Sequence, residues 1–530
     1  MQEDDTNTMV NLAQKLRQPS AYPHPVEKIE VVETHISLVF LTGTYAYKIK
    51  KAVNLGFLDF SSLENREHFC REELRLNRRL CKELYLDVLP VTIQGESVMI
   101  GGKGSIIDFV VKMLQFDRTK EVDTLLASNR ITGDHIDRIS RIVSAFHESA
   151  PAAGPDSAYG RAEILIKPIR DNFTEAERLK SQLQEKVLLK RLKQWTENEY
   201  SRLMPLFAER KANGAVRECH GDMHTGNMVL WKKNVMIFDC IEFNPLLSTI
   251  DVMSEIAFLI MDLEHSGHPE YAWRFLNNYL SLTGDYEGLP LLRFYKTYRA
   301  MVRAKVTAIR HLQEENREEK EKTLAEHYSY ISTALTCSSP AHPGLILTCG
   351  VSGSGKTSVA REIASHIPTI HIRSDIERKR LFGLKQFDRS GRDLGREMYS
   401  EKSSSRTYTR LFEIASTCLM NGYTVIVDAT FLRREERERF MALSRKAQCP
   451  VIILNCTAPV KLLEKRVTTR NQSGGDASEA DRSVLMEQLR NLRSFSTEEQ
   501  RVTITIDTST SASTASGITE TISRIQQGSP

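Results

Sequence analysis

The sequence has few of the features that mark secreted, membrane-spanning or disulfide-stabilised proteins. Its nine cysteines are scattered and include no C-x-x-C pair, which favours reduced thiols over a disulfide framework or a zinc site. The most apolar short run, Ile256–Met261, is bounded by Glu255 and Asp262 and is far too short to span a bilayer. The N-terminal residues MQEDDTNTMV are acidic and polar and do not resemble a signal peptide. These absences predict a cytoplasmic protein without a membrane partner.

The chain also lacks a strong excess of charge of either sign. Its 72 basic and 68 acidic residues leave a formal net charge of only +4, which does not favour a protein that coats nucleic acid. Hydrophobic residues make up 41% and charged residues 26%, the balance of an ordinary globular protein. At 530 residues the chain is long enough for roughly two to four domains. No heptad stretch is long enough to predict an oligomeric state.

The sequence pattern indicates one main domain boundary. The charge run EENREEKEK, Glu314 to Lys322, is typical of the solvated end of a helix, and the Ser/Pro-rich stretch CSSPAHPG follows it before the strand-like LILTCG. This order predicts a domain linker. The predicted divisions are an N-terminal extension over 1–24, a first domain over 25–336, the linker over 337–344, a second domain over 345–510, and a weakly ordered Ser/Thr-rich tail over 511–530 that could contain one helix.

The hydrophobic pattern differs on the two sides of the linker. Before it, HISLVFLTGTYAYKIKK predicts two strands around a Thr-Gly turn, SLENREHFCREELRLNRRLCKELY predicts a helix, and VTIQGESVMI and IIDFVVKML predict two more strands. A mainly helical region follows from about Thr132, so we expect an α+β domain with two lobes. After the linker, five strand-like runs alternate with helical stretches. This alternation predicts an α/β domain with a parallel sheet.

The stretches HGDMHTGN and NVMIFD place carboxylate and amide side chains around short apolar runs. Phosphoryl transfer needs positioning, a group that takes the proton of the accepting hydroxyl, and metal ions that screen the phosphates. Asp222 could take that proton, while Asn227 and Asp239 could offer magnesium the oxygen ligands that it prefers. The alternative is an ordinary turn, in which Asp222 caps a helix and Asn227 lies in an Asx turn. The spacing of the three residues favours the phosphotransferase interpretation.

The two stretches resemble the catalytic loop and the metal-binding segment of the aminoglycoside phosphotransferase family, whose members are relatives of the protein kinases. This resemblance implies a bilobal kinase-like fold. It also implies that Asp222 is the catalytic aspartate and that Asn227 and Asp239 are metal ligands. The family name describes a fold and does not imply an aminoglycoside substrate.

The same family pairs a lysine on a strand with a glutamate in the next helix. TGTYAYKIKKAV resembles the lysine strand, and the alignment makes Lys48 the phosphate contact, although periodicity alone does not separate Lys48 from Lys50 and Lys51. The partner glutamate would be Glu72 or Glu73, of which we favour Glu73. The sequence departs from the kinase pattern in having LTGT, and no G-x-G-x-x-G loop, before Lys48.

A second phosphate signature, GVSGSGKTS, follows the strand LILTC and fits the pattern G-x-x-x-x-G-K-[ST]. Glycines allow backbone N–H groups to turn toward phosphate oxygens, and the start of the following helix adds a favourable dipole. Lys356 should reach the terminal phosphates, and Thr357 should bind magnesium. The predicted nucleotide contacts are Gly350, Ser352, Gly353, Ser354, Gly355, Lys356 and Thr357.

Three further stretches resemble the small P-loop kinases, such as gluconate kinases, polynucleotide kinases and zeta-toxin-like proteins. HIRSDIERKRL places Asp375 at a strand end, TVIVDATF does the same for Asp428, and Arg466 and Arg470 lie on one helical face before a Gly-containing loop. The resemblance implies that Asp375 is the acceptor-side base, that Asp428 is the Walker-B-like metal carboxylate, and that the two arginines belong to a lid. The alternatives are that Asp375 caps its helix and that the arginines form a solvated face.

From about Pro25 to Asp507 the chain resembles bacterial fusions of an aminoglycoside-phosphotransferase-like domain with a P-loop ATPase or kinase domain. The leading interpretation is a bifunctional phosphotransferase in which each half transfers phosphate from ATP, with Mg²⁺, to a hydroxyl of a small molecule such as a sugar or nucleoside. One alternative is a regulatory P-loop ATPase with a kinase-like ligand-binding domain. The other is a nucleic-acid end kinase, which the modest net charge disfavours.

Overall fold

The computed structural model describes residues 11–526 apart from 55, 57, 179–182, 341 and 474–476. The first ten residues of the predicted N-terminal extension, and residues 474–476 of the loop predicted after Arg470, therefore lie outside the described residues. The chain forms two compact units. Unit 1 comprises Met1–Ile169 and Met204–Asp262, and unit 2 comprises Arg170–Leu203 and Leu263–Pro530.

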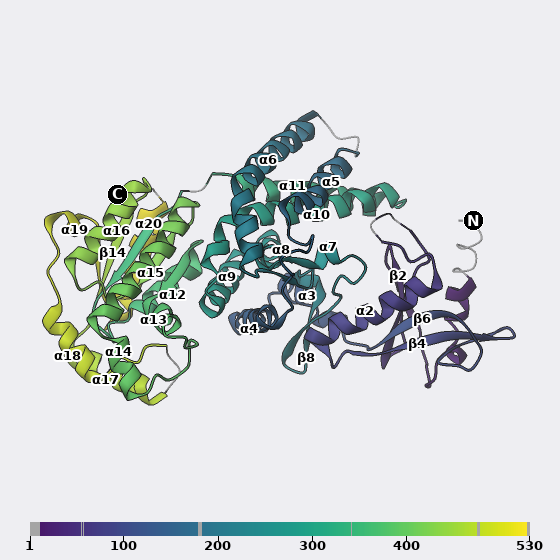
Figure 1. The fold of residues 1–530 in the computed structure, drawn as a ribbon, viewed down its shortest axis with the longest axis horizontal. Coiled ribbons are helices and arrows are strands. Elements are labelled where there is room, and N and C mark those ends of the chain that lie inside the picture. The colour runs from purple at the N-terminus through teal and green to yellow at the C-terminus, as the bar shows by residue number, and fades with distance from the viewer. Residues whose placement is uncertain are drawn as a thin grey trace. The chain divides into compact units, whose positions relative to one another are not determined.

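Unit 1 begins with a six-stranded antiparallel sheet whose strand order is β1-β2-β3-β6-β4-β5. Figure 1 labels β2, β4 and β6 of this sheet. The strands are β1 (Glu30–Glu33), β2 (Ser37–Leu41), β3 (Tyr45–Lys50), β4 (Tyr85–Gln94), β5 (Ser97–Ile100) and β6 (Ser105–Leu114). The predicted hairpin around the Thr-Gly turn is β2–β3. The prediction missed β1 and took VTIQGESVMI for one strand, whereas Gly95, at φ +62°, turns it into the β4–β5 hairpin.

Helix α2 (Leu63–Cys81), which the spacing predicted, packs on this sheet. It begins where the Ser62 side chain accepts the N–H of Asn65, and its last turn carries Arg78 and Arg79, which suit the negative end of the helix dipole. Its apolar face packs on β4 and β6. Glu73 and Asn77, one turn apart on α2, are also fully buried, and buried polar groups require partners.

The rest of unit 1 is mainly helical and carries two short antiparallel strand pairs, β8–β9 and β10–β7. Its elements are α3 (Val122–Ala127), α4 (Gly133–Ser149), β7 (Val216–Glu218), β8 (Met228–Trp231), β9 (Asn234–Ile237), α7 (Pro245–Ser248) and β10 (Thr249–Asp251). Three helices have residues in both units: α5 (Ala162–Glu177), α6 (Leu183–Ala212) and α8 (Val252–His265).

Unit 2 contains a five-stranded parallel sheet of order β12-β13-β11-β14-β15. All five predicted strands are present: β11 (Leu345–Cys349), β12 (Ile370–Arg373), β13 (Val425–Asp428), β14 (Val451–Thr457) and β15 (Thr503–Asp507). Most of its helices alternate with these strands, and a core of isoleucine, valine and leucine side chains lies between strands and helices. This alternation confirms the predicted α/β P-loop fold.

The helices of unit 2 form two groups along the sequence. One group precedes strand β11, and the other lies among and after the strands of the parallel sheet. They are α9 (Pro269–Thr283), α10 (Leu289–Gln313), α11 (Arg317–Ser338), α12 (Lys356–His366), α13 (Ser374–Leu381), α14 (Arg392–Met398), α15 (Glu401–Met420), α16 (Arg434–Lys446), α17 (Val460–Ser473), α18 (Arg482–Asn491), α19 (Thr497–Arg501) and α20 (Ser511–Gln526). Because α11 ends at Ser338, the first residues of the predicted linker are helical. No helix in the described part of the chain has the length and apolarity to cross a bilayer.

Within unit 2, a side chain of α9 closes the open edge of the parallel sheet. Asn277 donates from Nδ2 to the carbonyl of Thr369, and its Oδ1 accepts the N–H of His371, both at 2.8 Å. Strand β12 lies at the end of the strand order, so these backbone groups face away from the other strands. The amide therefore satisfies backbone groups that the sheet itself leaves unpaired.

The segment predicted as a weakly ordered tail around one possible helix forms helix α20 and packs against the parallel sheet. Ile518, Ile522 and Ile525 lie at helical spacing and join the core of unit 2. The Ser/Thr-rich composition concealed this stripe, because Ser and Thr occupy the exposed face while the isoleucines supply the apolar one.

Replacement of Gly517 by alanine tests this packing. A Cβ atom at Gly517 would lie 2.5 Å from Cγ1 of Ile506, a fully buried residue of β15. We expect G517A to lower the free energy of unfolding by about 1–3 kcal/mol through overpacking, although glycine-to-alanine within a free helix stabilises by roughly 1 kcal/mol. Thermal unfolding followed by circular dichroism measures the sign, with exposed Ser516→Ala as the matched control. A stabilised G517A would contradict the packing of α20.

Candidate active sites

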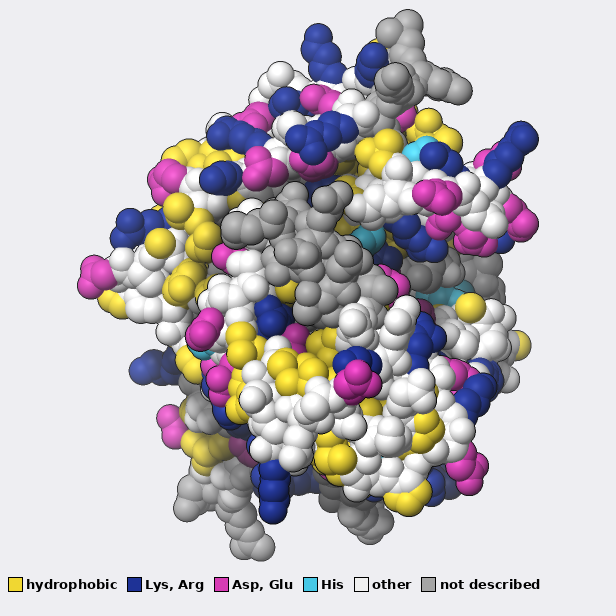
Figure 2. All heavy atoms as spheres, turned by 90° about the vertical axis from the view of Figure 1, so that its right-hand side faces the viewer, with side chains coloured by type: hydrophobic (Ala, Val, Ile, Leu, Met, Phe, Trp, Pro, Cys, Tyr) yellow, Lys and Arg dark blue, Asp and Glu magenta, His cyan; other side chains and the backbone are white. Residues whose placement is uncertain are grey.

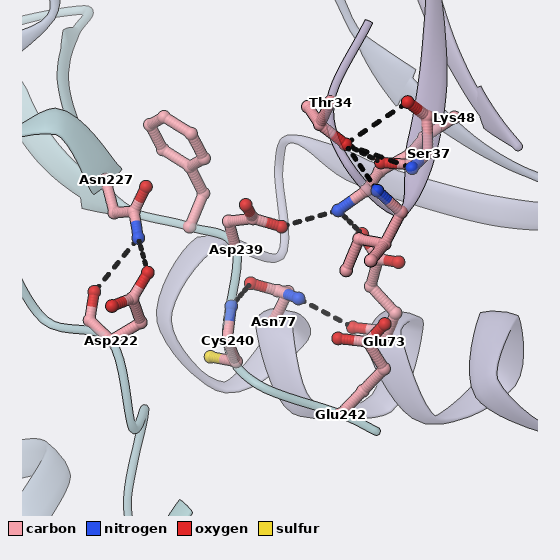
Figure 3. Close-up of polar contacts among 12 residues, drawn as sticks. Thr34, Ser37, Lys48, Glu73, Asn77, Asp222, Asn227, Asp239, Cys240 and Glu242 are labelled. Atoms are coloured by element: carbon pink, nitrogen blue, oxygen red, sulfur yellow. Dashed lines mark hydrogen bonds and ion pairs between the residues drawn. The ribbon is translucent and has the colours of Figure 1, made fainter. Parts of the chain in front are cut away.

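In unit 1, one hairpin brings two predicted metal ligands to the same place. Asn227 precedes β8 and Asp239 follows β9, and the antiparallel register pairs Met228 with Ile237. The N–H of Phe238 donates to the carbonyl of Asn227 at 3.0 Å. Both side chains therefore leave the same end of the hairpin, as Figure 3 shows.

The predicted catalytic aspartate lies beside Asn227. The Nδ2 group of Asn227 donates to the backbone carbonyl of Asp222 at 2.9 Å and to its carboxylate Oδ2 at 3.0 Å (Figure 3). These bonds use the amide nitrogen and leave Oδ1, the atom type that binds magnesium, outside them. The Asp222 carboxylate also lies 3.4 Å from Nε2 of His224, a residue that the sequence interpretation did not single out.

His220 connects the Asp222 loop to the strand that leads to Asp239. Its Nε2 donates to the carbonyl of Phe238 at 2.8 Å, and its Nδ1 accepts the N–H of Asp222 at 3.2 Å. Burial lowers the pKa of His220 and favours the neutral ring, in which one nitrogen donates and the other accepts. His220 therefore acts as a fixed hydrogen-bonding bridge within the loop.

Glu255 at the start of α8 supports the same loop and was not predicted. Its carboxylate accepts the N–H of His220 at 2.9 Å and the N–H of Gly221 at 2.6 Å, and its Oε2 lies 3.0 Å from Nε2 of His147. Burial opposes the charge on Glu255, but the hydrogen bond and charge of His147 outweigh it and hold the pKa of Glu255 to about 2.

The depressed pKa of Glu255 predicts a pH-dependent contribution to stability. A carboxyl whose pKa falls from 4.5 to about 2 on folding contributes stability above pH 4.5 and loses it as the pH falls toward 2. We expect E255Q to lower the free energy of unfolding of unit 1 on the order of 3 kcal/mol at neutral pH, and by less as the pH falls below 4.5. Urea unfolding across this range measures the difference. Glu67→Gln, at a side chain that is 38% exposed, is the control. A pH-independent difference would contradict the assignment.

The strand lysine and the helix glutamate meet beside the hairpin. Nζ of Lys48 lies 2.9 Å from Oε1 of Glu73 and 2.5 Å from Oδ1 of Asp239 (Figure 3). Glu72, the other predicted candidate, faces outward and pairs with Arg75. Lys51 points away as well and pairs with Glu33. The structure thus brings together Lys48, Glu73 and Asp239.

The turn nearest these residues is the β1–β2 turn. In it, the N–H of Ser37 donates to Oγ1 of Thr34 at 3.0 Å, and Figure 3 places both side chains beside Lys48. The register pairs Ser37 with Lys50, whereas LTGT forms the β2–β3 turn at the opposite end of the hairpin. The sequence interpretation compared the wrong turn with the glycine-rich loop because it missed strand β1.

In unit 2, the predicted phosphate loop joins β11 to α12. Gly350, Gly353 and Gly355 all have positive φ angles, the conformation that glycine adopts without strain. A Cβ at Gly350 would lie 2.4 Å from the carbonyl oxygen of Cys456, so only glycine fits there. Helix α12 begins at Lys356, and Nζ of Lys356 donates to the carbonyl of Val351 at 2.9 Å. The loop therefore has the strand–loop–helix context that a phosphate-binding loop requires.

Asp428 ends β13, next to β11 in the sheet, and is buried. Its Oδ2 lies 3.2 Å from Nε2 of His371 and 3.9 Å from Nε of Arg373, and its Oδ1 accepts a bond from Thr348 at 3.4 Å. Burial disfavours the carboxylate, but His371 and the nearby cations outweigh it and hold the pKa of Asp428 far below its usual range. Asp428 is therefore ionised at neutral pH, as a metal ligand requires.

A cavity of about 360 Å³ brings together most of the predicted residues of the second site, whereas Gly350 and Ser354 are not among the residues that line it. Among its lining residues are Ser352, Gly353, Gly355, Lys356, Thr357, Asp375, Asp428, Arg466 and Arg470. Asp375 lies in the first turn of α13, whose N-cap residue is Arg373, so Asp375 does not cap this helix. Arg466 donates to the carbonyl of Gly353 at 3.2 Å and to that of Thr508 at 2.8 Å, which places it against the phosphate loop.

The cavity is also lined by groups to which the sequence interpretation assigned no role. Arg378 is buried, donates to the carbonyl of Met398 at 2.8 Å, and has no hydrogen-bond partner for its Nε among the described residues. Tyr408 and Glu436 line the same cavity, and burial raises the pKa of Glu436 to about 7. These residues add hydrogen-bonding groups to the cavity that the phosphate loop lines.

Comparison with protein families agrees with this geometry. Residues 70–295 match the model of the phosphotransferase enzyme family, and residues 345–495 match the model of an AAA domain. The chain therefore contains a kinase-like region that matches the phosphotransferase family and a P-loop region that matches an AAA domain. Both matches agree with the resemblances seen in the sequence and support an enzyme of the kinase or ATPase class. Both families generally use ATP and Mg²⁺.

Relatives and solved structures similar to this chain span one or both domains. Uncharacterized proteins of Mycobacterium tuberculosis and Mycobacterium bovis are 27% identical over 458 residues, which cover 86% of this chain and 89% of theirs. A choline/ethanolamine kinase family protein of Mesorhizobium loti is 13% identical, covers 63% of this chain and 98% of its own, and has a TM-score of 0.37. A gluconokinase of Sinorhizobium meliloti is 20% identical, covers 36% and 99%, and has a TM-score of 0.26.

Proposed function

We propose that the chain is a bifunctional phosphotransferase in which each domain transfers the γ-phosphate of ATP to a hydroxyl of a small molecule. The observation that carries this proposal is that each unit holds its own set of a candidate proton acceptor, a lysine for phosphate and oxygen ligands for magnesium. In unit 1 the set is Asp222, Lys48, Asn227 and Asp239. In unit 2 it is Asp375, Lys356, Thr357 and Asp428.

In the kinase-like domain, Asp222 would orient the acceptor hydroxyl and take its proton as the hydroxyl oxygen bonds to the γ-phosphorus and ADP leaves. Lys48 would contact the phosphates, held in place by Glu73. Asn227 Oδ1 and the Asp239 carboxylate are hard oxygen donors at one end of a hairpin, and this donor set fits magnesium. The metal would supply charge neutralisation for the phosphates.

In the P-loop domain, Asp375, which lines the same cavity as the phosphate loop, would take the proton of the second acceptor. The backbone N–H groups of Gly353 to Thr357 and the start of α12 would hold the phosphates, with Lys356 at the transferred group. Thr357 and Asp428 supply oxygen donors that fit magnesium. Arg466 and Arg470 would offset the charge that develops during transfer.

The charges around the cavity favour a small hydroxyl-bearing acceptor over a nucleic-acid end. Apart from Lys356, Asp428 and the two predicted lid arginines, the charged residues that line it are two cations, Arg378 and Arg433, and four carboxylates, Asp375, Glu401, Glu436 and Glu487. The phosphate backbone of a nucleic acid would instead require an excess of cations at the site. On the face shown in Figure 2, the basic and acidic side chains of the described residues are interspersed, without a broad region of one sign. Glu436 and Tyr408 suit a sugar or nucleoside, whose hydroxyls both donate and accept.

Label transfer tests the proposal. The full-length protein is incubated with γ-labelled ATP, magnesium and a small-molecule cell extract, and products are separated from free phosphate. Labelled small molecules would support the phosphotransferase assignment. Release of free phosphate alone would favour a regulatory ATPase, and labelling of an added RNA or DNA oligonucleotide with a free 5′-hydroxyl would favour an end kinase.

A further inference from the structure

Two lysines on strand β3 share one glutamate in the kinase-like site. Lys48 and Lys50 are two residues apart and therefore point to the same face of the sheet. Oε1 of Glu73 lies 2.9 Å from Nζ of Lys48, whereas Oε2 accepts a hydrogen bond from Nζ of Lys50 at 2.8 Å. Nζ of Lys50 also donates to Oε1 of Glu242, three residues after Asp239. The two lysines thus divide the carboxylate of Glu73 between them.

The two lysines differ in what they can reach. The side chain of Lys50 is 1% exposed, and its partners Glu73 and Glu242 are 0% and 4% exposed. Lys48 is partly open, and its second partner, Asp239, is 46% exposed. Lys48 can therefore exchange Asp239 for a phosphate, but Lys50 is enclosed by protein and keeps the same partners.

The segment that follows Asp239 is held from helix α2 and strand β3. Asp239 has φ +66°, a left-handed conformation that non-glycine residues adopt only when neighbours enforce it. The N–H of Cys240 donates to Oδ1 of Asn77 at 3.0 Å, and Nδ2 of Asn77 donates to the carbonyl of Glu73 at 2.9 Å. Figure 3 shows Asn77, Cys240 and Glu242 grouped below Asp239. The contact of Lys50 with Glu242 holds the same segment two residues after Cys240.

We propose that Lys50 is a positioning residue that binds Glu73 and Glu242 and thereby fixes the metal-binding segment while Lys48 exchanges Asp239 for a phosphate. This inference rests on the proposed nucleotide-binding role of unit 1. Lys50 touches neither nucleotide nor metal. It acts by holding the backbone that presents Asp239 and by keeping Glu73 available to Lys48. Residues that orient a metal ligand in this way change the affinity of the site for the metal.

The test measures magnesium-dependent nucleotide binding in the full chain with Lys356→Ala, so that the P-loop does not contribute. A fluorescent ATP analogue is titrated with and without magnesium. We expect the double variant K50M/E242M to require about 10- to 100-fold more magnesium for the same binding, with metal-free nucleotide binding nearly unchanged. The double variant removes the charges of Lys50 and Glu242 together, so that Glu242 is not left as a buried carboxylate without a partner. Glu73 keeps its contact with Lys48. Thermal unfolding verifies that it is folded.

The matched control is Lys51→Met. It removes a lysine next to the same strand end, whose partners in the described part of the chain are exposed Glu33 and the backbone carbonyl of Thr34. It should leave the magnesium dependence unchanged. If folded K50M/E242M shows the magnesium dependence of its parent, the positioning role is overturned. If the parent itself fails to bind the nucleotide with magnesium, the proposed function of unit 1 fails, and this inference falls with it, before any change at Lys50 is considered.

Discussion

Asp222→Asn should lower phosphorylation by the kinase-like domain about 10²- to 10⁴-fold, the range for loss of a positioned proton acceptor. Asparagine has nearly the same shape as aspartate, and Asn227 also bonds to the backbone carbonyl of Asp222 at 2.9 Å, so the loop should keep its conformation. The affinity for ATP should therefore change little while turnover falls. Label transfer in a Lys356→Ala chain measures this domain by itself.

The control for Asp222→Asn is Asp134→Asn, an exposed change in the first turn of α4 that should leave transfer unaltered. A chain carrying Asp222→Asn and Lys356→Ala that still labels its acceptor at the parental rate would remove Asp222 from the mechanism. Loss of ATP binding together with turnover would instead indicate that the substitution disturbs the loop.

Lys356→Ala should lower nucleotide binding or turnover in the P-loop domain about 10²- to 10³-fold, the typical cost of removing one preorganised group that faces developing charge. Lys356 is the first residue of α12, and its Nζ donates to the carbonyl of Val351, so the ammonium already lies within the curve of the phosphate loop. Equilibrium binding of labelled ATP should reveal two sites in the parent chain and one in the variant.

An exposed lysine in the last turn of α16, Lys446, provides the matched control, because Lys446→Ala removes the same charge away from the cavity. Two undiminished ATP sites in Lys356→Ala would contradict the assignment of the loop. If one site is lost and labelled acceptors persist, they belong to the kinase-like domain, and Asp222→Asn should abolish them.

Local patterns predicted the parts of both sites that neighbouring residues build. The phosphate loop needs only a strand, a run of glycines and a helix start, all within Leu345–His366, so its sequence was sufficient. Asn227 and Asp239 meet because a short hairpin joins them, and its length is visible in the sequence. The alternation of strands and helices likewise predicted the parallel sheet, because crossover connections admit few arrangements.

Contacts between distant segments were not predictable in this way. Lys50 and Glu242 are 192 positions apart, and nothing in the spacing of KIKK distinguishes a buried lysine from one that faces a cleft. The choice between Glu72 and Glu73 depended on the rotation of α2 about its axis, where one residue shifts a side chain by about 100°. Glu255 is important because it accepts two backbone N–H groups from a loop 34 and 35 positions earlier, a role that leaves no local signal.

The sequence by itself determined the two kinds of domain and the candidate phosphate-binding residues, because these depend on local geometry and on residue type. Only the tertiary structure decided how the buried charges are shared, with Lys48 between Glu73 and Asp239 and Lys50 between Glu73 and Glu242. The physical reason is that a buried charge is stable only beside its partner, and the partners here lie on a strand, a helix and a loop that only the folded chain brings together.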